Sequence, residues 1–69
     1  MSAFTNIADP LVELHHLEFR ERSVAKKWER ALDRLGQFPN GALVRQVAEL
    51  AAERDSLQRA IAELTAELQ

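Results

Sequence analysis

Apolar residues recur at alternating steps of three and four along two stretches of the chain. The first row consists of Leu14, Leu17, Glu21, Val24, Trp28, Ala31 and Leu35. The second row consists of Leu43, Val47, Leu50, Arg54, Leu57, Ile61, Leu64 and Leu68. Such heptad spacing places each row along one side of an α-helix and requires a facing helix to cover it. The pattern therefore predicts two long helices that pack against each other.

Proline and glycine mark where these helices begin and end. Asp9 can cap the first turn, and Pro10 suits the first helical position, where its missing N–H costs nothing. Gly36 suits the left-handed position that follows a helix. Because the two helices have similar lengths and a short connection, they are predicted to form an antiparallel all-α hairpin. The chain then divides into an N-terminal arm over residues 1–8 and a hairpin over 9–69, with a helix at 10–35, a turn at 36–40 and a helix at 41–68.

The small size of the chain predicts self-association. Domains of 69 residues bury little surface and usually depend on disulfides, a metal or oligomerisation. The chain has no cysteine, and its two histidines alone cannot close a zinc site. A further row of small residues lies at Val44, Ala48, Ala51 and Ala62. We therefore predict a homodimer in which two hairpins form a four-helix bundle, with core and dimer residues Leu14, Leu17, Val24, Trp28, Leu35, Leu43, Val47, Leu50, Leu57, Ile61 and Leu64.

Each apolar row is interrupted by one ionisable residue, Glu21 in the first and Arg54 in the second. If Leu35 lies level with Leu43, Arg54 falls level with Val24, about one helical turn from Glu21. One interpretation is an ion pair that fixes the register of the helices, within or between protomers. The other is that one or both side chains extend to solvent at the edge of the row. The sequence leaves both open.

Charged residues are distributed unevenly between the two predicted helices. The net charge is −2, yet residues 20–34 carry six basic against three acidic residues. Arg22, Lys26, Arg30 and Arg34 form a basic stripe opposite the Trp28 row, and Val12 and Phe19 fall on the same side. An exposed aromatic beside arginines is typical of a protein-binding surface, although the arm could instead cover Phe19 with Phe4 or Ile7. The predicted partner-binding residues are Phe19, Arg22, Lys26, Arg30, Arg34, Glu49 and Glu53.

Other classes of function find little support in the sequence. Glu13 and His16 have the carboxylate–histidine spacing of di-iron bundles, but both lie off the apolar row. We see no nucleophile–base arrangement and no phosphate loop, so neither an enzyme nor a cofactor is expected. The acidic second helix opposes binding to nucleic acid, and no apolar run reaches the ~20 residues that span a membrane. The N-terminus lacks the features of a secretory signal, so we expect a cytoplasmic protein.

The layout of the chain resembles a known family. Two helices around Gly36-Gln37-Phe38-Pro39-Asn40-Gly41, with a second helix rich in Ala, Leu, Arg and Glu, resemble the small anti-quorum-sensing proteins of Mu-like temperate phages. The resemblance covers the whole chain as layout, without a motif that carries over site residues. It implies a hairpin dimer that binds the LuxR-type activator LasR and blocks its action on DNA. It also implies inhibition of the type IV pilus assembly ATPase PilB.

A second resemblance rests on the Gly-x-x-Pro turn, Gly36 to Pro39. The helical-hairpin co-chaperones of type III secretion needle subunits share this layout, which implies a heteromeric complex in place of the homodimer. A generic coiled-coil adaptor is the remaining alternative. All three interpretations predict a non-catalytic protein that binds other proteins.

Overall fold

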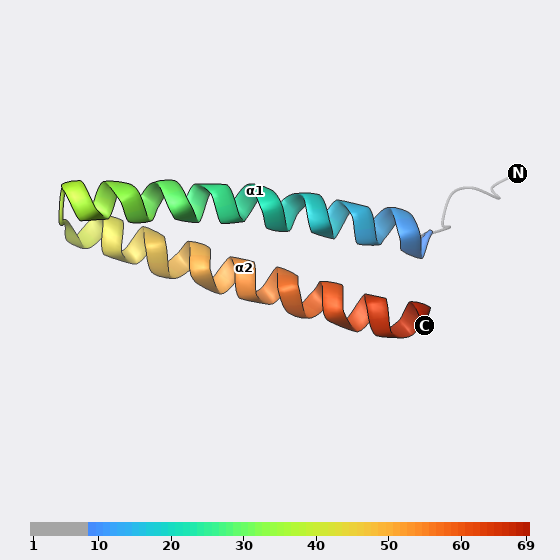
Figure 1. The fold of residues 1–69 in the computed structure, drawn as a ribbon. Helices are drawn as coiled ribbons and strands as arrows, with labels where there is room; N and C mark the ends of the chain where they lie inside the picture. The colour runs from blue at the N-terminus through green and yellow to red at the C-terminus, as the bar shows by residue number, and fades with distance from the viewer. Residues whose placement is uncertain (1–8) are drawn as a thin grey trace, which may run out of the picture.

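The computed structural model describes residues 9–69, and these form two helices joined by a tight turn (Figure 1). Helix α1 spans Pro10–Gln37 and helix α2 spans Gly41–Leu68, each with 28 residues. The helices run antiparallel and pack against each other as a hairpin, which confirms the predicted all-α architecture. The arm over residues 1–8, and with it the expectation that Phe4 or Ile7 covers Phe19, lies outside the described residues.

Both helices begin at capping residues. Asp9 Oδ1 accepts a hydrogen bond from the Leu11 amide at 2.9 Å, and Pro10 occupies the first helical position. Asn40 Oδ1 accepts hydrogen bonds from the amides of Ala42 and Leu43 at 2.7 and 3.3 Å. Each cap satisfies amide groups that have no partner within the helix. Side-chain chemistry at these two positions therefore fixes where the helices begin.

The first helix ends two residues later than predicted. Gly36 lies inside α1, and no described glycine has a positive φ, so the prediction of a left-handed stop at Gly36 is wrong. The last helical residue is Gln37, and the helix is capped by Phe38, which has φ −133° and whose amide donates a hydrogen bond to the Arg34 carbonyl at 2.7 Å. Pro39 disfavours the helical conformation of the residue before it. Pro39 thus explains the end of α1 better than Gly36 does.

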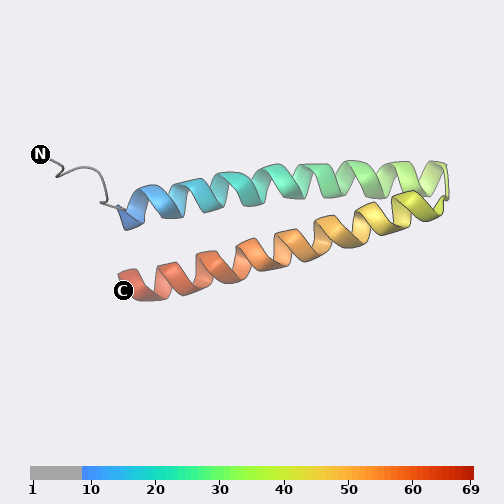
Figure 2. The same cartoon turned by 180° about the vertical axis from the view of Figure 1, so that it is seen from behind.

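The hairpin covers its apolar rows only in part. Among the described residues, just Val24, Ala31 and Leu57 are buried. The other apolar members of both rows are half-buried, except Leu68, which is exposed. In both views the helices lie closest at the turn and diverge towards the chain ends (Figures 1 and 2). Two helices alone leave much of the predicted core in contact with water.

Candidate protein-binding surfaces

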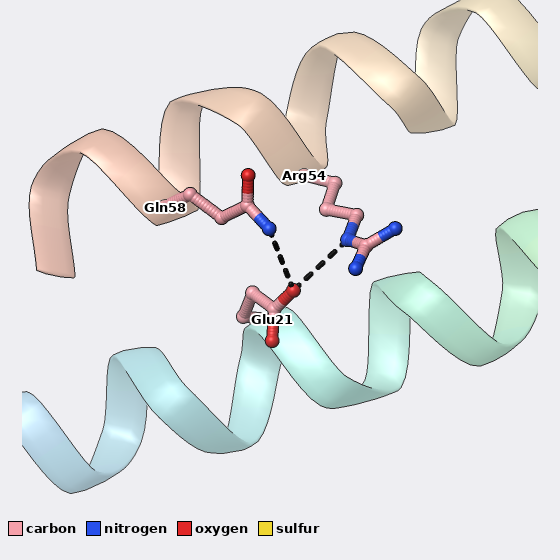
Figure 3. A network of polar contacts seen from close by, with 3 residues as sticks. All are labelled: Glu21, Arg54 and Gln58. Atoms are coloured by element: carbon pink, nitrogen blue, oxygen red, sulfur yellow. Dashed lines mark hydrogen bonds and ion pairs between the residues drawn. The ribbon is translucent and has the colours of Figure 1, made fainter.

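A polar network joins the two helices near their middle (Figure 3). Glu21 Oε2 accepts a hydrogen bond from Arg54 Nε at 2.9 Å and one from Gln58 Nε2 at 3.3 Å. The side chains of Glu21 and Arg54 retain 17% and 35% of their exposure. The two charges that interrupt the apolar rows therefore meet within one chain, as the ion-pair interpretation predicts, and do not extend separately into solvent.

Gln58 is a member of this network that the sequence reasoning missed. It lies four residues after Arg54, and residues at that spacing share one side of a helix. The apolar pattern gave no reason to examine it, because it lies outside the row. Its position relative to Arg54 is the signal that identifies it as a second donor to Glu21.

Trp28 lies beside the network. The guanidinium carbon of Arg54 is 5.5 Å from the centroid of the Trp28 ring, within the range of a cation–π contact. The Trp28 Nε1 atom is buried and has no hydrogen-bond partner in the part of the chain that the structure describes. Arg54 thus pairs with Glu21 through its Nε atom and lies over an aromatic ring of the facing helix.

One side of the hairpin carries the network and a large apolar surface. Two shallow hollows on this side are lined by Glu18, Glu21, Arg22, Gln58 and Ile61, and by Trp28, Ala51, Arg54, Asp55 and Gln58. Helical spacing places further leucines and valines on the same side. We call this side the open face and define it by the residues on each helix that share it, which are Leu11, Leu14, Glu18, Glu21, Ala25, Trp28 and Leu32 on α1, and Val44, Val47, Ala51, Arg54, Gln58, Ile61, Thr65 and Leu68 on α2.

Several large apolar side chains of the open face are in contact with solvent. Leu11, Leu32 and Val44 are 57%, 38% and 54% exposed. Leu14 and Val47 are half-buried, and Ala51 is exposed. Exposed large apolar side chains that gather on one face, as these do at its two ends, indicate a site of protein interaction.

The opposite side of the hairpin is charged. Near the turn, Lys27, Arg30 and Arg34 line a hollow together with Gln46 and the apolar Ala31 and Leu50. Towards the chain ends, Glu13, Glu63 and Glu67 line another, together with the apolar Leu17, Ala60 and Leu64. This charged face has a basic half and an acidic half, and the predicted partner-binding residues Glu49 and Glu53 are exposed on α2. Such a surface remains hydrated in the hairpin.

The far side of α1 carries the predicted basic stripe. Arg22, Lys26, Arg30 and Arg34 are all exposed, and none forms an ion pair within residues 9–69. Phe19 is 66% exposed and Val12 is 52% exposed. The described part of the chain therefore leaves this aromatic and its basic neighbours uncovered. At the turn, Phe38 is likewise 65% exposed.

The carboxylate–histidine spacing of Glu13 and His16 lies at the solvent-exposed start of α1. Glu13, His15 and His16 are exposed, and the described residues contain no group of three or more His, Cys, Asp or Glu side chains that could hold a metal ion. In the same part of the chain, neither helix is apolar enough over a sufficient length to cross a membrane.

Comparison with known proteins gives no match to any family model, curated protein or solved structure. The function must therefore be argued from the surfaces of the hairpin. The open face, the charged face and the far side of α1 differ in chemistry and point in different directions. They are the features from which a binding function can be inferred.

Proposed function

We propose that this chain is a non-catalytic, protein-binding inhibitor that acts as a dimer of helical hairpins. The observation that carries the proposal is the incomplete core. Only three described side chains are buried, while Leu11, Leu32 and Val44 remain more than one-third exposed. A hairpin of this size gains too little from its own packing to dispense with a partner surface. A second hairpin that completes a four-helix bundle supplies one.

The proposed target is a host transcriptional activator of quorum sensing, of the LuxR type. The layout that resembles the phage anti-activator proteins supports this choice. The mechanism is occlusion, in which the hairpin dimer covers the surface of the activator that meets DNA. DNA-binding surfaces are basic, and Glu49 and Glu53 are exposed on α2 to meet such a surface.

The far side of α1 provides a different surface for a second target. Phe19 lies among exposed basic side chains there, which is the composition of a protein-binding hot spot. We assign this surface to the pilus assembly ATPase that the resemblance implies. A needle-subunit co-chaperone or a generic adaptor would use the same exposed surfaces, but in a heteromeric complex.

Sedimentation and partner binding test the proposal separately. Analytical ultracentrifugation at micromolar concentration should give a dimer, and a folded, cooperatively melting monomer would refute the architecture. For the target, a LuxR-type activator bound to its operator duplex is mixed with the chain, and loss of the shifted duplex is measured. We expect release of the duplex by the wild type and not by Glu49→Lys with Glu53→Lys.

The matched control carries Glu29→Lys with Asp33→Lys, which changes the net charge equally but on α1. This control should release the duplex as the wild type does. Persistence of the shifted duplex with the wild-type chain would refute the choice of target. Pull-down of a secretion needle subunit in its place would favour the co-chaperone.

A further inference from the structure

The open face has the same order of side chains on both helices. On α1, Leu14 and Leu32 lie on either side of Glu18 and Glu21. On α2, Val44 and Val47 precede Arg54 and Gln58, and apolar residues follow them towards Leu68. Apolar residues therefore stand towards both ends of the open face on each helix, so that the end of one copy can meet the opposite, also apolar, end of a reversed copy.

The heptad spacing gives the register of an antiparallel contact between two copies of α2. When two antiparallel helices pack, the two heptad positions that face the partner helix pair with each other. The pairs across α2 are then Val44 with Leu68, Val47 with Thr65, Ala51 with Ile61, and Arg54 with Gln58. The centre of this contact lies midway between Arg54 and Gln58.

The same rule applied to α1 pairs Leu14 with Leu32, Glu18 with Trp28, and Glu21 with Ala25. The centre of this contact lies midway between Glu21 and Ala25. Glu21 bonds to both Arg54 and Gln58, so the centres on α1 and α2 lie at nearly the same level of the hairpin. A single two-fold axis can therefore relate both helices to those of a second copy.

The polar network is incomplete in one copy in a way that a second copy completes. Arg54 uses Nε for Glu21, and its terminal nitrogens have no hydrogen-bond partner in the described chain. The amide oxygen of Gln58 also lacks a partner there and points away from Glu21 (Figure 3). The register places Arg54 of one copy opposite Gln58 of the other, so donor meets acceptor twice across the axis.

We infer that the open face is a self-recognition surface, which packs on the open face of a second copy about a two-fold axis through the Glu21–Arg54–Gln58 network. The inference rests on the proposed dimer and specifies its face, its direction and its register. The apolar ends are covered by the opposite ends of the second copy. The polar middle sets the register, because a shift would leave the terminal nitrogens of Arg54 and the amide oxygen of Gln58 without partners in the second copy.

Cross-linking of introduced cysteines tests this register, since the chain has no cysteine of its own. Ala51→Cys and Ala62→Cys are combined in one chain. These positions lie about 16 Å apart along α2, too far for a short bifunctional maleimide within one helix. Between copies they come close, because Ala62 directly follows Ile61, which the register places opposite Ala51. We expect a covalent dimer from the double variant and little from either single variant.

The control combines Glu49→Cys with Glu63→Cys on the charged side of α2, which should remain uncross-linked. Circular dichroism verifies that each variant is helical, and sedimentation gives its oligomeric state. A dimer that the 51–62 pair does not cross-link would overturn the open face as the interface while leaving the dimer intact. A monomer would overturn both proposals.

Discussion

Replacement of Glu21 and Arg54, singly and together, gives the sharpest test of the network that joins the helices. At an N–O separation of 2.9 Å the gross attraction is about 6 kcal/mol for an effective dielectric constant of about 20. Removal of both charges from water offsets most of this attraction. Because Arg54 keeps about a third of its exposure, solvent also screens the pair. The net contribution is therefore much smaller than the gross attraction.

Loss of one partner has a different consequence from loss of both. Glu21→Leu leaves a half-buried guanidinium without its carboxylate, and Arg54→Leu leaves a half-buried carboxylate with only Gln58. We expect each single change to lower the free energy of unfolding by about 2 kcal/mol, the scale of a charged hydrogen bond. The double change places two leucines in the apolar rows, and we expect it to differ from the wild type by less than about 1 kcal/mol.

Urea unfolding of the four chains at one protomer concentration measures these differences, since the stability of the proposed dimer would depend on concentration. The control is the same cycle at Asp55 and Arg59, an i, i+4 pair whose side chains are 56% and 75% exposed. The coupling free energy between these two exposed side chains should be no more than about 0.5 kcal/mol. If the losses at Glu21 and Arg54 simply added in the double variant, the network would not act as a unit and the reasoning would fail.

Three further changes test the packing and the surfaces. Gly36→Ala should raise the free energy of unfolding by about 0.5–1 kcal/mol in a thermal melt, because Gly36 is helical with open space around it. A lower free energy of unfolding in this variant would instead indicate that Gly36 adopts the left-handed conformation. Leu57→Ala should lower it by about 2–4 kcal/mol in urea, and a change below 0.5 kcal/mol would show that Leu57 is not core. Leu32→Glu should raise the dissociation constant of the proposed dimer at least about tenfold by sedimentation, whereas Val12→Glu on the far side of α1 should not; equal effects would contradict the open face as the interface.

The sequence predicted the hairpin and the contact between Glu21 and Arg54, because both follow from the helical spacing of the rows and from the position of the turn between them. It misplaced the end of α1 because two local rules compete there. A glycine can stop a helix, and a proline restricts the residue before it; the restriction that Pro39 places on Phe38 determined where the helix ends. It missed Gln58 because an amide outside the apolar row has no periodic signal. The open face was beyond reach from the sequence, since it is defined only when side chains of both helices share one side of the hairpin.

The direction of the open face bears on how targets would be bound. Phe19 and the basic stripe lie on the side of α1 away from α2, so a dimer formed through the open face leaves them uncovered. Two-fold symmetry then duplicates this surface, with one copy on each hairpin. A target that is itself dimeric would be held at two sites, and its avidity would exceed the affinity of either site alone. Variants at Leu32 should therefore weaken retention of a dimeric target even though Leu32 does not touch it, whereas they should leave binding of a monomeric fragment unchanged.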